Sequence, residues 1–259
     1  MLKRFQDKVA IVTGGARGIG AAICEKLAQE GARIVVNYVE NAEAAKSVVK
    51  RIKGKGENAF SFCCDVSEFS QADDMMEETF KRFGRIDILV NNAGIFSQAL
   101  VEEVTPEEWQ KDIEVNLIGT FNCSKAVIPY LKKREKGRII NCSSISAKLP
   151  DIGLSGYAAS KAAINNFTMV LAAELAPYNI TVNAYGPGII ETDMTRDMIL
   201  NRGDGQLKQI ALRRFGKPEE VANPVTFLAS DEADYITGVI ISIDGGMLIV
   251  QNPWRAKRL

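Results

Sequence analysis

Seven short runs of apolar, often β-branched residues alternate along this chain with longer segments whose apolar residues recur at helical spacing. Runs of nearly continuous apolar character suit parallel strands that helices bury on both faces of a sheet. The alternation therefore predicts an α/β fold with a doubly wound sheet. The expected strands are residues 8–13, 33–37, 58–63, 86–91, 137–142, 180–184 and 239–243, and the expected helices are residues 19–30, 41–54, 68–83, 107–134, 156–176 and 218–229.

No linker, charge block or low-complexity tract interrupts this alternation, so residues 1–259 are expected to form a single domain. An apolar fraction of 46% is enough for a large core. Pro224 conflicts with the pattern, because it falls inside the helix expected at 218–229. There it should remove a hydrogen bond and kink the helix.

The charge balance and the cysteine pattern exclude several classes of function. The 32 basic and 32 acidic residues are spread along the chain, which leaves no electrostatic footprint for nucleic acid. No apolar run is long enough to cross a bilayer and residues 1–8 do not resemble a signal peptide, so we expect a soluble, cytoplasmic protein without a membrane partner. The five cysteines have no C-x-x-C spacing and no histidine accompanies them, so we expect no metal site.

A glycine-rich turn links the first expected strand to the first expected helix. Its sequence is Gly-Gly-Ala-Arg-Gly-Ile-Gly over residues 14–20. Glycine lets a backbone approach a phosphate closely, and the amides at a helix N-terminus favour negative charge. The turn therefore predicts a phosphate-binding loop, although glycine-rich turns also occur for packing alone.

Small and hydrogen-bonding residues follow most of the other expected strands as well. In open parallel sheets, ligands bind beyond the carboxyl ends of the strands, in the crevice where the strand order reverses. We therefore expect a dinucleotide to bind across these strand ends. The segments concerned are residues 13–20, 37–40, 65–66, 91–94, 143–144 and 185–192.

Tyr157 and Lys161 stand four residues apart in an expected helix, in a chain that contains no histidine. Side chains at this spacing share a helix face, so the ammonium can approach the phenol. A nearby positive charge stabilises the phenolate and lowers the pKa of a tyrosine, which makes Tyr157 a candidate general acid and base. The alternative is a surface pair on an amphipathic helix.

Seven motifs, in order and in register, resemble those of the short-chain dehydrogenase/reductase family between about residues 8 and 246. They are the turn at 13–20, Asp65, the Asn-Asn-Ala-Gly sequence at 91–94, Asn116, Ser144, the Tyr-Ala-Ala-Ser-Lys sequence at 157–161, and Pro187 and Gly188 with Thr192. The resemblance implies a Rossmann-type three-layer sandwich with a seven-stranded parallel sheet. It also implies a nicotinamide cofactor and, usually, a homotetramer.

The resemblance assigns roles in hydride transfer between nicotinamide and a ketone or secondary alcohol. Tyr157 would transfer the proton, Lys161 would hold the ribose hydroxyls of the cofactor and lower the pKa of Tyr157, and Ser144 would orient the carbonyl. Asn116 would hold a water in a relay from Lys161 to solvent. The alternative for Asn116 is a buried helical asparagine that bonds a neighbouring carbonyl.

The residues expected near the adenosine ribose favour NADP(H), with NAD(H) as the alternative. An acid at the end of the second strand would bind the ribose of NAD, but this chain has Asn37 there. Arg17 can pair with the extra phosphate of NADP; the alternative is a solvated turn residue. Glu40 could reach the ribose and restore a preference for NAD(H). Asp65 would meet the adenine, or it only forms a turn. The other expected cofactor contacts are Gly14, Gly18, Ile19, Gly20, Val66, Asn91, Gly94, Tyr157, Lys161, Pro187, Gly188, Ile190 and Thr192.

The substrate side carries fewer motifs. We expect its wall to comprise residues 146–156, Tyr185 and residues 191–215, the last forming a helical, movable lid. Apolar residues at helical spacing more often pack than touch a substrate, but adaptable methionines such as Met194 suit a pocket that closes over an apolar chain.

Within the family, the chain most resembles the 3-oxoacyl-(acyl-carrier-protein) reductases, so we expect a carbonyl reductase of this type. One departure puts binding of acyl carrier protein in doubt, because Tyr178 stands where carrier-binding reductases typically have Arg. Arg134 is either a second carrier-facing arginine or a solvated helix end. A sugar or polyol dehydrogenase is the alternative function. A cofactor-binding sensor without turnover is disfavoured, because the catalytic motif is complete.

Residues 247–259 form a C-terminal tail that combines an apolar run at 247–250 with Trp254 and basic residues. Exposed apolar ends are unfavourable in a monomer, so we expect burial of the tail against a neighbouring subunit. A disordered basic tail is the alternative.

Overall fold

Seven parallel strands form one sheet in the computed structural model, which describes residues 3–249. Their order is β3-β2-β1-β4-β5-β6-β7, so the order reverses between β1 and β4. The strands are β1 (Val9–Val12), β2 (Arg33–Tyr38), β3 (Ala59–Cys63), β4 (Ile88–Asn91), β5 (Gly137–Cys142), β6 (Ile180–Pro187) and β7 (Ile240–Ile243). The predicted α/β fold with a seven-stranded parallel sheet is confirmed.

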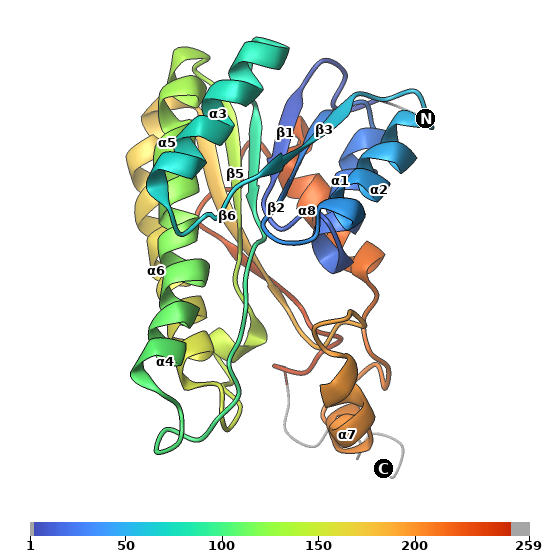
Figure 1. Ribbon diagram of the computed structural model, residues 1–259, viewed down its shortest axis with the longest axis vertical. Helices are drawn as coiled ribbons and strands as arrows, with labels where there is room; N and C mark the ends of the chain where they lie inside the picture. The colour runs from blue at the N-terminus through green and yellow to red at the C-terminus, as the bar shows by residue number, and fades with distance from the viewer. Residues whose placement is uncertain (1–2, 250–259) are drawn as a thin grey trace.

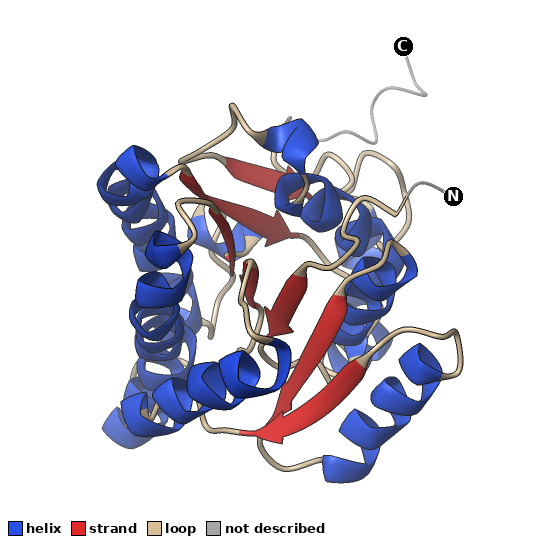
Figure 2. Ribbon diagram, turned by 90° about the horizontal axis from the view of Figure 1, so that it is seen from above, coloured by secondary structure: helices blue, strands red, loops and turns tan. Residues whose placement is uncertain are grey.

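Helices cover both faces of the sheet and complete a three-layer sandwich (Figures 1 and 2). The first layer contains α1 (Gly18–Gln29), α2 (Ala42–Lys53) and α8 (Pro218–Ala229), and the second contains α3 (Phe69–Phe83), α4 (Pro106–Ile113), α5 (Gly119–Lys133) and α6 (Ser155–Leu175). A further helix, α7 (Arg196–Leu207), lies near the same end of the molecule as α4, the lower end in Figure 1.

The core is divided by the sheet, because neighbouring residues of a strand point to opposite faces. In β1, Ala10 and Val12 pack in the cluster under α1 and α8, whereas Ile11 packs in the cluster under α3 and α5. All three side chains are fully buried. Burial of each valine or isoleucine contributes roughly 1.5–3 kcal/mol, which explains why these strands are apolar throughout rather than alternating.

The helix expected at 107–134 is divided in the structure. It consists of α4, a π-helical turn at Glu114–Ile118 and α5, which contains Pro129. A single π-helical turn adds only one residue to the helix, which is too small a change for the sequence pattern to reveal. Helix α8 continues through Pro224, and strand β6 continues to Pro187, beyond the end expected at residue 184.

Two further expectations concern membrane-spanning helices and the C-terminal tail. No helix within residues 3–249 combines the length and the apolar character that crossing a bilayer requires. Most of the expected C-terminal tail, from residue 250 on, lies outside the described residues. The last described residue of that tail, Ile249, is 72% exposed.

Candidate active site

The turn between β1 and α1 is so tight that it requires glycine. Gly14 and Gly18 have φ angles of 59° and 52°, in the left-handed region that glycine adopts at little cost. A Cβ atom on Gly20 would lie 2.2 Å from the carbonyl oxygen of Gly14. Arg17 precedes the helix in an extended conformation, and its side chain is exposed instead of capping the first turn of α1. The amides of that turn can therefore receive an anion, as expected of a phosphate-binding loop.

Partly buried hydrogen bonds hold this loop against the ends of β4 and β6. Thr13 Oγ1 accepts from the backbone amides of Asn92 and Ala93 at 2.9 and 3.0 Å. Asn92 Nδ2 donates to the carbonyl oxygens of Thr13 and Gly14 at 2.9 and 3.2 Å. The Tyr185 hydroxyl donates to Asn92 Oδ1 at 3.0 Å. The crevice at the reversal point of the sheet is thus built from three strand ends held in one network.

Two residues that were expected to line the crevice face inward instead. Asn37 is 1% exposed, and its Oδ1 accepts from the Gly14 amide at 3.0 Å while its Nδ2 donates to the Cys64 carbonyl at 2.9 Å. The prediction that its side chain meets the adenosine ribose is therefore wrong, because the amide is used to hold the loop. Tyr185 is fully buried in the core, so its predicted place in the substrate wall is also wrong.

The two residues that follow β3 and Cys64, Asp65 and Val66, make contacts that stabilise the fold. Asp65 Oδ1 accepts from the amide and the hydroxyl of Ser67 at 3.0 and 2.7 Å, which is the turn-forming role given as the alternative. Val66 is 3% exposed and packs on α5, where a Cβ atom on Gly119 would lie 2.5 Å from Val66 Cγ2. Contact of Asp65 and Val66 with the adenine stays a prediction.

Ser144, Tyr157 and Lys161 meet between β5 and α6. Lys161 is 2% exposed, its Nζ donates to the Cys142 carbonyl at 2.8 Å, and it lies 5.6 Å from the centre of the Tyr157 ring. Ser144 Oγ accepts from the Ser146 amide at 3.1 Å. Because that bond uses Ser144 Oγ as an acceptor, its hydroxyl hydrogen can be donated to another group.

The electrostatics of the pair differ from the expectation. Burial raises the pKa of Tyr157 well above its ordinary value, nearby Cys142 adds to the rise, and the Ser144 hydroxyl opposes it. Burial also lowers the pKa of Lys161. The predicted lowering of the Tyr157 pKa is therefore wrong for this structure, because burial is the largest influence on the phenol and raises its pKa. Tyr157 stays protonated at neutral pH and is suited to donate a proton.

Asn116 lies in the π-helical turn and is fully buried. Its Nδ2 donates to the Ile95 carbonyl at 2.9 Å and to Ser160 Oγ at 3.1 Å, and its Oδ1 accepts from the Ile95 amide at 2.9 Å. The alternative of a buried asparagine that bonds a neighbouring carbonyl describes this side chain, and the water relay stays a prediction. A Cβ atom on Gly94 would lie 3.0 Å from Asn116 Oδ1 and 3.4 Å from Lys161 Nζ, so glycine brings these groups together.

Asn91 is 2% exposed and points between the strands and α5. Its Nδ2 donates to Asn141 Oδ1 at 2.9 Å and to Ser124 Oγ at 3.0 Å. Any support that this side chain gives to a cofactor is therefore indirect.

The segment after β6 meets the glycine loop. A Cβ atom on Gly18 would lie 3.2 Å from Thr192 Cγ2, and one on Gly188 would lie 2.8 Å from the Cα atom of Asp244. Pro187 is the last residue of β6, and Ile190 is 4% exposed and paired in a bridge with Gly216. Thr192 therefore lies beside the loop, where the nicotinamide end of a cofactor is expected.

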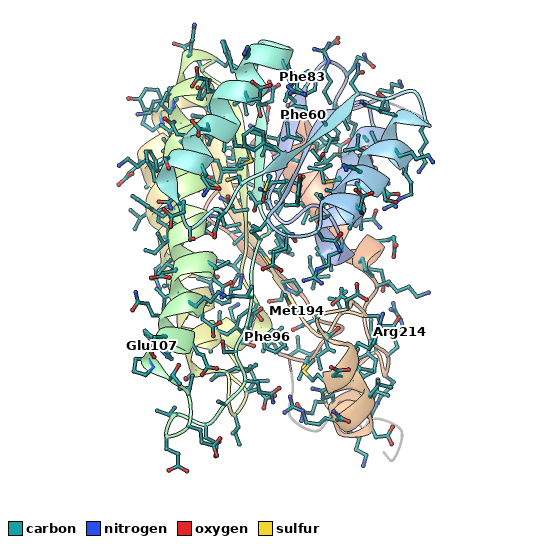
Figure 3. The ribbon with its side chains drawn as sticks, in the orientation of Figure 1. Phe60, Phe83, Phe96, Glu107, Met194 and Arg214 are labelled. Carbon is teal, nitrogen blue, oxygen red and sulfur yellow. The ribbon has the colours of Figure 1, made fainter. Side chains whose placement is uncertain are left out.

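Phe96 is a site residue that the motifs of the sequence do not indicate. Its ring lies edge-on to the Tyr157 ring at 5.9 Å between centroids. Figure 3 shows it in the lower half of the molecule, at the same height as Met194. Its position two residues after the Asn-Asn-Ala-Gly motif is the only signal that could have indicated it.

Known proteins match this chain over nearly its whole length. The short chain dehydrogenase family matches residues 8–202. The 3-oxoacyl-[acyl-carrier-protein] reductase FabG of Staphylococcus epidermidis is 42% identical over 241 residues, which cover 93% of this chain and 99% of that protein. The reductase of the same name from Thermotoga maritima is 43% identical over 246 residues, which cover 95% of this chain and 100% of that protein.

Solved structures share the fold. The crystal structure of gox2181 matches with a TM-score of 0.92 and 34% identity, covering 96% of this chain and 99% of that one. A short chain dehydrogenase from Burkholderia cenocepacia in complex with NADP matches with a TM-score of 0.88 and 36% identity, covering 94% of this chain and 99% of that one.

A doubly wound sheet with a glycine cradle at its reversal point and a Ser-Tyr-Lys cluster beside it defines a dinucleotide-dependent oxidoreductase. The chain belongs to the short-chain dehydrogenase family, which confirms the resemblance seen in the sequence. It is an NAD(P)-dependent enzyme that acts on C=O or CH–OH groups. The tight turn and the exposed Arg17 fit the pyrophosphate and ribose side of such a cofactor.

Proposed function

We propose that this enzyme is an NADPH-dependent carbonyl reductase that acts on a 3-oxoacyl-type ketone. The observation that carries the proposal is the meeting of Ser144, Tyr157 and Lys161 beside the glycine cradle, in a chain 42% identical to a 3-oxoacyl-[acyl-carrier-protein] reductase. A tyrosine whose pKa is raised by burial is a proton donor, which suits reduction of a ketone at neutral pH.

The residues of the chain position the ketone and supply its proton. A bound nicotinamide would supply a hydride to the carbonyl carbon, and the carbonyl oxygen would take one proton to become a hydroxyl. Ser144 donates a hydrogen bond to that oxygen and orients it. Tyr157 gives up its phenolic proton to the same oxygen. Lys161, anchored by the Cys142 carbonyl, then compensates the charge that develops on the phenolate.

Preference for NADPH rests on two features of the adenosine side. Arg17 is exposed at the start of α1, where a guanidinium can pair with a ribose phosphate. Strand β2 contains no acid and ends in Tyr38, so no carboxylate of this strand repels that phosphate. The solved NADP complex of a 36% identical relative supports the same choice. Glu40, which is exposed, is the one nearby acid of the second strand end that opposes it.

The substrate is proposed to bind between residues 146–156 and the lid at residues 191–215. Met194 is 44% exposed, so an adaptable apolar side chain is available to an acyl chain. Both residues considered for carrier recognition have other partners, because Arg134 Nε lies 3.1 Å from Asp87 Oδ1 and Lys132 Nζ lies 4.0 Å from the Tyr178 ring centre. These contacts favour recognition of the 3-oxoacyl end itself over recognition of an acidic carrier.

We also propose that the enzyme is a homotetramer, as the resemblance implied, and that it is cytoplasmic. Helices α5 and α6 expose Phe121 at 42%, Met169 at 45% and Val170 at 58%. Exposed apolar side chains are unfavourable in water, so burial of these helices against another subunit would stabilise the protein. Size-exclusion chromatography with light scattering at micromolar concentration tests the assembly, and a monomer would contradict it.

One titration and one substrate panel test the function. We expect NADPH to bind more tightly than NADH, and 3-oxo esters and thioesters to drive NADPH oxidation. Activity with glucose or polyols and none with the oxo esters would support the sugar dehydrogenase alternative and overturn the proposal. Comparing acyl carrier protein thioesters with small thioesters decides whether the carrier contributes to KM.

A further inference from the structure

The helix that carries Tyr157 begins without a cap of its own. Its N-cap residue is Leu154, whose side chain has no acceptor for the amides of the first turn. Those amides include that of Tyr157, the third residue of α6. An uncapped first turn frays readily, and here fraying would displace the proposed proton donor.

Asp112 of α4 brings a carboxylate to this turn. It is 1% exposed, and the backbone amide of Tyr157 faces its carboxylate and helps to stabilise the charged form. A Cβ atom on Gly156 would lie 3.0 Å from Asp112 Oδ2, which shows how closely the carboxylate approaches the start of α6. A negative charge at this place also interacts favourably with the helix dipole.

The same carboxylate holds the segment that follows β4. The Ser97 amide lies 3.1 and 3.2 Å from the two oxygens of Asp112, and the Ser97 hydroxyl donates to Oδ1 at 3.3 Å. Four residues further along the helix, Asn116 binds both backbone groups of Ile95. Between the two anchors lies Phe96, whose ring contacts the Tyr157 ring at 5.9 Å.

A buried carboxylate is costly unless hydrogen bonds compensate its lost hydration. Burial raises the pKa of Asp112, while the bonds from Ser97 and Tyr157 oppose the rise. An apolar residue would fill the same space without that cost. We propose that Asp112 is a positioning residue, which fixes the backbone of Tyr157 and the ring of Phe96 so that the phenol reaches the substrate oxygen. The inference rests on the proposed role of Tyr157.

Asp112→Asn tests it with an almost unchanged side-chain volume. The amide keeps one acceptor oxygen and directs an N–H toward a backbone donor, so one of the two anchored segments loses its partner. We expect kcat to fall at least about tenfold, because small displacements of a reacting group reduce rate strongly. The KM for NADPH should stay unchanged, and Glu107→Gln, an exposed acid of the same helix, should behave as wild type.

The pH profile separates positioning from a general loss of stability. The groups that face Tyr157 are Lys161 on the same helix, Cys142 at the end of β5, Ser144 after β5, Tyr185 of β6 and Asp112 on α4, with Glu108 near Asp112. The charge of Asp112 contributes to the raised pKa of Tyr157. Removing it should move the alkaline limb of kcat to lower pH. A variant that is merely less stable would keep the wild-type limb.

A double-mutant cycle with Phe96→Leu tests whether both residues act through one contact. We expect their effects on kcat to be less than additive, since either change releases the same ring pair. Amide hydrogen exchange gives a readout that needs no activity. Residues 155–158 and 95–98 should exchange at least about tenfold faster in Asp112→Asn, since a lost acceptor exposes their amides to opening, and at the wild-type rate in Glu107→Gln.

Tyr157→Phe, measured in parallel, distinguishes failure of the inference from failure of the proposed function. If Tyr157→Phe abolishes turnover while Asp112→Asn keeps wild-type kcat, alkaline limb and exchange rates, Asp112 has no positioning role. If Tyr157→Phe itself retains full turnover, the proposed mechanism is wrong, and the exchange rates alone then decide whether Asp112 anchors these segments.

Discussion

The two walls of the crevice are held in different ways. On the cofactor wall, Thr13, Asn92 and Tyr185 join three strand ends through a network of partly buried hydrogen bonds of 2.9–3.2 Å. On the substrate wall, α7 is tied to the loop before α6 by an ion pair of partly exposed side chains, Arg202 and Asp151, at 3.3 Å. A cofactor of constant shape suits a fixed cradle, and a substrate that varies within a family suits a wall with weaker ties.

The ends of the substrate wall are nevertheless anchored. Ile190 forms a bridge with Gly216, and the Leu212 amide donates to the Gly245 carbonyl at 3.0 Å. Between these anchors Leu200 is 76% exposed. We therefore expect the segment to move about fixed ends, and four measurements would test this contrast.

The largest effect on activity is expected from loss of the Tyr157 hydroxyl, which lies between the two walls. Tyr157→Phe should lower kcat by roughly 100-fold or more, as loss of a general acid implies. Steady-state kinetics with a 3-oxo ester measures this, and NADPH binding followed by fluorescence should stay unchanged. Tyr130→Phe, at a partly buried tyrosine of α5 that packs on Phe80, is the control.

The rigidity of the cofactor wall is tested next by Gly20→Ala. The new Cβ atom would overlap the Gly14 carbonyl, which lies 2.2 Å from its position, so the loop must shift. We expect about 1–3 kcal/mol of destabilisation and a matching loss of NADPH affinity. Gly205→Ala in α7 is the matched control, because no atom lies within 4 Å of its Cβ position. Equal behaviour of the two variants would contradict the proposed difference between the walls.

Cofactor preference gives a smaller effect. Arg17→Ala should weaken NADPH binding about tenfold and leave NADH binding nearly unchanged, because a charge-assisted hydrogen bond contributes roughly 1.5–3 kcal/mol before solvent screening. Titration with each cofactor at two salt concentrations measures it. Equal losses for NADPH and NADH would show that Arg17 shapes the turn rather than binding the ribose phosphate.

The smallest effect is expected on the substrate wall. Arg202→Ala removes an ion pair whose side chains are 38% and 47% exposed, and such pairs contribute little in water. We expect less than about a threefold change in the KM for substrate and no change in unfolding temperature beyond error. A tenfold rise in KM would show that this pair closes the lid, and would weaken the contrast with the cofactor wall.

Local patterns account for what the sequence predicted well. The strand and helix alternation, the glycine turn and the Tyr-x-x-x-Lys spacing are each contained in a few consecutive residues. The inward direction of Asn37 and Tyr185 was missed, because it depends on which strands become neighbours. The rise in the pKa of Tyr157 was missed for a related reason, since burial is set by β5 and by the residues after β4 rather than by the helix that carries the pair.

Asp112 and Phe96 belong to the same class of omission. In the sequence, Asp112 is one polar residue of an amphipathic helix, and its partners Ser97 and Tyr157 lie 15 and 45 positions away along the chain. Only the packing of α4 against the start of α6 reveals that these groups share a site.

The π-helical turn at Glu114–Ile118 makes the length of this long helix critical. The Gly119 amide bonds to the Glu114 carbonyl five positions earlier, so the turn holds one residue more than an ordinary helix would. A deletion of one codon here would leave an ordinary helix. It would also remove the wide turn that presents Asn116 to the Ile95 carbonyl and to Ser160 Oγ, so this buried contact would be displaced while the secondary structure looked intact.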